Sequence, residues 1–248
     1  MNSLFWKGIL HMQTVADLYT YEILTKNQPD LIEKAAVCLA RTFTGVDVAG
    51  KWVQEPIIGY SLKLPYDDFY QFTKEYIETN VHQGYCAVAL DEKQNVVGAL
   101  VGDTNALEIL EGDIFSGTFS DMNIVMDVLE DIDVRFLEDY KKRYGKDMED
   151  SEVLHLFLLG VIAEHNRHEI VQTLGDILIQ KATEEGLRLV LAEATNPKSM
   201  SLLEKYHGLT KYVDAQGNFI VHKYANNEHL NDIPSDVADG IYIIVKEL

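Results

Sequence analysis

The stretch from Glu152 to Val161 (EVLHLFLLGV) is apolar at nearly every position, and it constrains the fold more than any other part of the chain. A half-exposed strand alternates apolar and polar residues, whereas a strand that is covered on both faces has no need to alternate. The run therefore predicts a central strand whose sheet carries helices on both faces.

A regular alternation of elements follows this strand. A polar turn (IAEHNRHE) leads into an amphipathic helix from about Ile170 to Glu185, and Gly186 ends it. A strand over 188–194 and a short helix over 199–206 come next. The first N–H groups of a helix lack intrahelical partners and lie at its positive end. The start of the helix near Ile170 is therefore a candidate pyrophosphate site.

The rest of the chain predicts a mixed sheet with further helices. We expect a strand over 19–25, helices over 29–43 and 65–84, a loop over 44–64, a hairpin of strands over 85–90 and 96–101, mostly helical sequence over 103–150, and two last strands over 219–224 and 241–245. This order belongs to the α/β (α+β) class. A length of 248 residues suits a single domain over 1–248 that contains an insertion at about 103–150.

The charge balance restricts the partners. Forty acidic residues against 21 basic ones give a net charge of −19, which disfavours nucleic acid and anionic membrane surfaces. A cationic amine would be attracted to an acidic surface, although the charge can also serve solubility alone. Cys38 and Cys86 lie among apolar neighbours and are expected to be buried free thiols. The N-terminus shows no signal-peptide pattern and no apolar run is long enough to span a bilayer, so we expect a cytoplasmic protein.

The order of motifs over roughly residues 20–224 resembles the GNAT superfamily of N-acyltransferases. The resemblance is carried by the apolar strand, the polar turn with Arg167, a helix that ends in EEG, the next strand with ATN, and the EKYHGL segment. A Glu-Pro pair after the first helix and the long insertion before the central strand are similar to the arylalkylamine N-acetyltransferases. The resemblance implies a mostly antiparallel mixed sheet, acetyl-CoA as acyl donor, a small amine as acceptor, and a monomer or homodimer.

The resemblance also implies where the acyl-CoA binds. In the family, the splayed end of the central strand contacts the pantetheine arm, and the following turn holds the pyrophosphate. In this chain the corresponding positions are Leu159, Gly160, Val161, Arg167, His168, Glu169, Ile170, Val171, Asn196 and Ser199. The turn from Asn166 to Val171 contains no glycine, unlike the usual family turn, whose glycines allow close approach of N–H groups to phosphate. Arg167 is expected to supply a charged contact instead, the alternative being a solvated surface charge.

Glu55 is the candidate general base. An amine must lose a proton before it attacks a thioester, and a carboxylate in apolar surroundings has the raised pKa that suits this role. The flanking apolar residues are Trp52, Val53, Pro56, Ile57 and Ile58. The alternative is an exposed loop glutamate.

The family's general acid is a tyrosine in the last short helix. The expected positions, Leu202 and Leu203, are apolar in this chain, so Tyr206 is the nearest candidate, with an ordinary core or surface aromatic as the alternative. The eight histidines have no metal-binding spacing, and His155, inside the apolar strand, is expected to be a hydrogen-bonded core residue. No metal site is predicted.

Three functions remain open at this point. The first is an acetyl-CoA-dependent N-acetyltransferase that works by direct attack of the amine in a ternary complex, with a backbone N–H near Gly160 or Val161 stabilising the tetrahedral intermediate. The second is a non-catalytic acyl-CoA or partner-binding module, which the missing glycines favour. The third is an enzyme that uses a longer acyl chain or a carrier-protein-bound donor.

Overall fold

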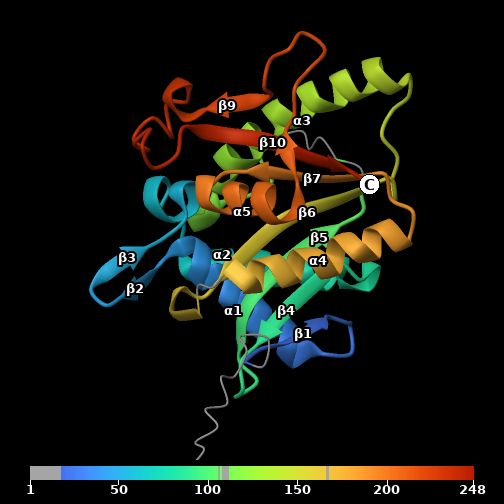
Figure 1. Ribbon diagram of the computed structural model, residues 1–248. Helices are drawn as coiled ribbons and strands as arrows, with labels where there is room; N and C mark the ends of the chain where they lie inside the picture. The colour runs from blue at the N-terminus through green and yellow to red at the C-terminus, as the bar shows by residue number, and fades with distance from the viewer. Residues whose placement is uncertain (1–17, 106, 108–111, 166–167) are drawn as a thin grey trace, which may run out of the picture.

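A computed structural model describes residues 18–105, 107, 112–165 and 168–248 (Figure 1). Eight of its strands form a central sheet in which only β6 and β7 run parallel. In spatial order these are β1 (Thr20–Ile23), β4 (Cys86–Leu90), β5 (Val96–Asp103), β6 (Val153–Val161), β7 (Leu189–Ala194), β10 (Gly240–Glu247) and β8 (Thr210–Lys211), with β9 (Val221–Lys223) also paired to β10. The predicted mixed, mostly antiparallel sheet is confirmed.

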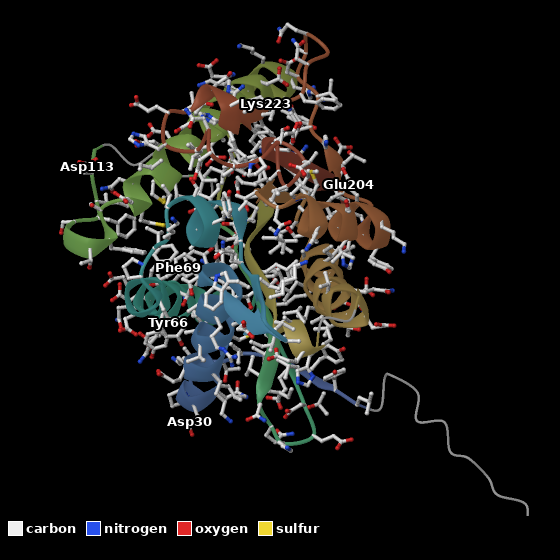
Figure 2. All side chains as sticks on the ribbon, turned by 90° about the vertical axis from the view of Figure 1, so that its left-hand side faces the viewer. Asp30, Tyr66, Phe69, Asp113, Glu204 and Lys223 are labelled. Atoms are coloured by element: carbon white, nitrogen blue, oxygen red, sulfur yellow. The ribbon has the colours of Figure 1, made fainter. Side chains whose placement is uncertain are left out.

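Helices cover both faces of the sheet, as the apolar run of β6 predicted (Figure 1). On one face lie α1 (Pro29–Thr44), α2 (Tyr66–Asn80) and α3 (Met122–Tyr144), and on the other lie α4 (His168–Glu184) and α5 (Pro197–His207). Within α2 the apolar stripe points inward: Phe69 is 1% exposed and stacks on Phe43, whereas Tyr66 lies at the surface (Figure 2). None of the described helices combines the length and the apolar character that crossing a membrane requires.

Two sequence predictions need correction. The segment 44–64 is not a plain loop: it holds a hairpin of β2 (Val46–Val48) and β3 (Lys51–Val53), then a π-helical turn, η2 (Pro56–Ser61). Strands of three residues are too short to show an alternating pattern, so the sequence does not reveal them. The segment 103–150 is less helical than expected. Its described part holds α3 and a short 3-10 turn, η4 (Gly117–Phe119), because glycines precede the amphipathic stretch.

A β-bulge at Phe157 opens the sheet beside β6. The register with β5 skips there, so that Val101 faces Leu158 but Gly102 faces Leu156. Gly102 permits this geometry, since a Cβ at that position would lie 2.4 Å from the carbonyl oxygen of His155. A bulge bends its strand and increases the twist. Accordingly, β6 and β7 pair only over three residues, up to His155 and Leu191, and then separate.

Candidate functional site

The gap between β6 and β7 connects two cavities. The inner cavity lies towards α3 and has mostly apolar walls, which include Phe43, Phe69, Phe72, Val125, Leu129, Leu156, Phe157, Leu158, Ala192 and Ala194. The outer cavity lies between the end of β6 and helices α4 and α5, and its walls include Val161, Ile162, Ala163, Val171, Asn196, Lys198 and Leu202. Five side chains line both cavities, namely Phe43, Glu55, Leu159, Thr195 and Ser199. These five therefore mark the passage between the two cavities.

Glu55 is fixed in this passage by the start of η2. Its Oε2 accepts hydrogen bonds from the N–H groups of Ile57 and Ile58 at 2.8 and 2.7 Å, as a helix N-cap does. Its own N–H donates to the carbonyl oxygen of Phe43 at 3.1 Å, which ties the turn to the end of α1. One carboxylate oxygen is thus held in place, and the orientation of the second oxygen is set with it.

The second oxygen of Glu55 is buried and is not held by the turn. Oε1 has no hydrogen-bond partner in the part of the chain that the structure describes, and the residue is only 6% exposed. Burial raises the pKa of Glu55 to about 7, although the N–H of Ile58, the nearby Thr195 side chain and the N–H of Ile57 partly offset it. The residue is therefore not an exposed loop glutamate. Of the flanking residues expected to shield it, Pro56, Ile57 and Ile58 are buried, whereas Trp52 is 57% exposed. Distant parts of the chain, such as Thr195 and Tyr224, complete the surroundings.

The separation of β6 from β7 exposes peptide groups at the passage. Ile162 donates its N–H to the carbonyl oxygen of Val97. In an antiparallel ladder every second residue is hydrogen-bonded to the partner strand, so the N–H and C=O groups of Leu159 and Val161 point away from β5. Beyond His155 they have no β7 residue opposite them and face the opening. Gly160 differs, because it pairs with β5 and allows close packing of α1, where an added Cβ would meet Thr42 at 3.1 Å.

The remaining residues predicted to bind CoA lie around the outer cavity or beside it. Helix α4 begins at His168, Val171 lines the cavity, Glu169 is exposed, and Ile170 is buried in the core instead. Asn196 caps α5 by accepting from the N–H of Lys198 at 3.0 Å, and Ser199 donates to the Asn196 carbonyl oxygen at 3.0 Å. The predicted contact of Arg167 falls outside the described residues.

Tyr206 does not line either cavity. It lies half-buried near the end of α5, where the ammonium of Lys205 is 3.2 Å from its hydroxyl and 4.8 Å from its ring centroid. The sequence placed this residue near the passage because it belongs to the correct helix. The structure does not bring it there, since Ser199, Leu202 and Leu203 are the α5 residues nearest the passage, and Tyr206 lies about one turn beyond them.

Sequence reasoning missed three residues at the site. Thr195 lies in the passage beside Glu55, and Lys198 brings a positive charge to the outer cavity. Tyr224 is buried near Glu55 and donates to the carbonyl oxygen of Thr195 at 2.9 Å. The ATN motif contained the signal for Thr195. No local pattern distinguishes Tyr224 from an ordinary core aromatic. No group of three or more His, Cys, Asp or Glu in the described ranges is arranged to hold a metal ion.

Comparison with known proteins relates this arrangement to a fold. No protein-family model and no curated protein sequence matches the chain. Among solved structures, an agmatine N-acetyltransferase in its apo form aligns with a TM-score of 0.64 at 17% identity, over 93% of this chain and 100% of that one. Arylalkylamine N-acetyltransferase 2 from Aedes aegypti gives 0.60 at 13% identity, over 92% and 98%. The C-terminal condensation domain of Ebony, in complex with β-alanyl-dopamine, gives 0.60 at 17%, over 93% and 99%.

The chain therefore has the fold of the GNAT N-acetyltransferases, which the order of its sequence motifs predicted. At these identities the likeness concerns the fold, and the chemistry has to be argued from the site itself.

Proposed function

We propose that the protein is an acyl-CoA-dependent N-acyltransferase that transfers an acyl group, with acetyl as the first candidate, to a small primary amine. The observation that carries the proposal is Glu55. One of its oxygens is held by two backbone N–H groups, the other is open, and the residue lies where an outer and an inner cavity meet. This is the geometry needed to take a proton from an amine in one cavity while a thioester enters from the other.

The proposed reaction is a direct transfer. Glu55 removes a proton from the ammonium, the amine nitrogen attacks the thioester carbonyl carbon, and a tetrahedral intermediate forms. The N–H of Leu159 or Val161 stabilises its oxyanion. After the attack the nitrogen carries a second surplus proton. It gives up this proton as collapse breaks the C–S bond, and the thiolate takes up one proton to leave as the free thiol. Thr195 and Ser199, which line the passage, replace Tyr206 as the candidates: their hydroxyls can relay the proton that the nitrogen loses to the thiolate.

The acyl-CoA would occupy the outer cavity. The start of α4 offers N–H groups and the positive end of the helix dipole, and Lys198, at the start of α5, adds a cation to the lining. Arg167, just before α4, is proposed to contribute as well. The structural neighbours support this assignment, because those named above include acetyltransferases for agmatine and for arylalkylamines.

A different donor is the second candidate. The turn from Asn166 to Val171 has no glycine, and the Ebony condensation domain, which has the same fold, is described as a condensation domain and not as an acetyltransferase. A donor on a carrier protein, which brings no CoA pyrophosphate, would fit both facts, and a longer acyl group would fit the second. Cys38 and Cys86 are buried free thiols, which agrees with the cytoplasm as the proposed location.

Thiol release distinguishes these possibilities. Acetyl-CoA, longer acyl-CoAs and acyl-pantetheine are each offered with a panel of primary amines, and release of free thiol is followed. Amine-dependent release from acetyl-CoA supports the first candidate. Release only from longer acyl-CoAs or acyl-pantetheine favours the second. No release, combined with no heat on titration with CoA, would contradict the proposal.

A further inference from the structure

A third cavity continues from the inner one and is strongly acidic. The two share Leu129, Phe157 and Glu193 as wall residues. The carboxyl side chains that line this acidic cavity are Asp103, Asp127, Glu130, Asp133 and Glu193. His155 lines it too, and its described lining includes no Lys or Arg. The path from the passage therefore leads through apolar walls to a concentration of negative charge.

Glu193 points into this path from β7. Alternation along the strand puts it on the same face as Leu191 and Thr195, towards α3. Its side chain is only 3% exposed. Oε2 lies 2.7 Å from His155 Nε2, whereas Oε1 has no hydrogen-bond partner among the described residues. A buried carboxylate oxygen is costly without a partner, and the neighbouring Asp133 is the group that can supply one.

Asp133 meets Glu193 from α3. Its Oδ1 is also buried, and a side-chain hydrogen bond links the two carboxyls when one of them carries a proton. Burial and the neighbouring Glu193 charge raise the pKa of Asp133 to about 9, so at neutral pH this carboxyl keeps its proton and can donate it to Glu193. A pair of carboxyls that shares one proton keeps a net charge of about −1, which one cation can balance.

His155 does not neutralise the cluster. Its Nδ1 lies 3.3 Å from Asp103 Oδ2, which also accepts a hydrogen bond from the Tyr76 hydroxyl. Burial lowers the pKa of His155, but the charges of Glu193 and Asp103 outweigh it and raise the pKa well above its ordinary value. The imidazolium therefore balances one of the two ionised carboxylates. One negative charge is left in excess, even with Asp133 protonated.

We propose that the acidic cavity binds a second cationic group, an ammonium or a guanidinium, at the far end of the amine substrate, so that the preferred acceptors carry a cation at both ends of a short apolar spacer. Glu193 and Asp133 are the residues that receive it. This inference rests on the proposed function, because it places the reacting amine at Glu55. A network that served the fold alone would balance its charges, whereas this one lines a cavity with five carboxyl groups and with no Lys or Arg among the described residues.

The spacing of the strand sets the length of the spacer. Thr195, beside Glu55, and Glu193 are two residues apart on the same face, which corresponds to about 7 Å along β7. The walls between them are contributed by apolar side chains such as Leu129 and Phe157. A chain of a few methylene groups fits this distance and these walls, whereas a monoamine of equal length would leave the excess negative charge of the cavity unbalanced.

The test compares alkyl diamines, from diaminopropane to diaminohexane, with monoamines of the same chain length, using the acyl donor that gives thiol release. Wild-type protein should show a higher kcat/KM for the diamine of best length than for its monoamine. Glu193→Gln, which still accepts a hydrogen bond from His155, should reduce this preference by ~10–100-fold, the loss expected for one charged hydrogen bond. Asp133→Asn serves as a second variant. Glu138→Gln, on the same helix but with a 64% exposed side chain, is the matched control and should keep the preference.

Every result of this comparison either supports the inference or overturns it. Equal kcat/KM for diamines and monoamines, or a preference that both variants retain, overturns the inference and leaves the proposed function intact. If no amine is acylated, the proposed function fails, and binding is measured as the shift in Tm caused by the diamine and by the monoamine alone. A shift specific to the diamine that Glu193→Gln abolishes supports the cavity's role, and no such shift overturns it.

Discussion

Replacing Glu55 by Gln is expected to remove a pH dependence of the stability and to lower the activity. Burial raises the pKa of Glu55 from 4.5 to about 7. Between these values the folded protein keeps a proton that the unfolded chain releases, so the folded state is favoured at low pH, and this contribution is lost as the pH rises through the folded pKa. At about 1.4 kcal/mol for each pKa unit, the wild-type protein loses about 2–3 kcal/mol through this one group between about pH 5 and pH 8.5.

The Gln side chain removes this pH dependence. It keeps an oxygen that can accept from the N–H groups of Ile57 and Ile58, but it cannot ionise. Its free energy of unfolding relative to wild type should therefore increase by about 2–3 kcal/mol from pH 5 to pH 8.5, whatever its value at pH 5. Urea denaturation followed by circular dichroism at both pH values measures the difference. Glu92→Gln, in the exposed β4–β5 turn, is the control and should show no such trend.

Activity should fall in the same variant. Loss of a general base lowers kcat by roughly 10²–10⁴-fold near neutral pH, with CoA affinity nearly unchanged, and the loss should shrink at high pH, where free amine is abundant. Wild-type kcat/KM should rise with pH through a group near 7. A stability difference that is constant with pH would contradict the burial argument. Wild-type kcat in Glu55→Gln at every pH would refute its role as the base.

Three other outcomes are expected. Saturating acyl-CoA should raise the Tm, because a ligand at 100 times its Kd stabilises the native state by about 2.7 kcal/mol; an unchanged Tm with acetyl-CoA and longer acyl-CoAs speaks against an acyl-CoA site. Arg167→Ala and Lys198→Ala should each weaken CoA binding by about 1–3 kcal/mol in calorimetric titration if their charges reach the phosphates; unchanged affinity would place that side chain in solvent. Gly102→Ala should cost about 1–3 kcal/mol in urea denaturation, because its Cβ would lie 2.4 Å from the His155 carbonyl oxygen; wild-type stability would show that the bulge tolerates a side chain.

The candidate site was only partly predictable from the sequence. Glu55 could be selected, because a Glu-Pro pair is visible and Pro56 restricts it, but its burial depends on β7 and on Tyr224, far along the chain. Tyr206 was selected because it lies in the correct helix, on nearly the same face as Ser199, but it lies about two turns further along the helix and lines neither cavity. The pairing of Asp133 with Glu193, sixty positions apart, has no local signature.

The sequence by itself determined the elements and their order. Apolar periodicity fixes which segments become helix or strand, and the residues that end α1, α3 and α5 are glycines with positive φ, a conformation that other residues adopt only at a cost. The tertiary structure alone decided the bulge at Phe157, the separation of β6 from β7, and the three cavities that follow from it. The reason is physical. Periodicity records which face of a segment is buried, whereas a cavity and a shifted pKa depend on which distant side chains reach the same space and exclude water from it.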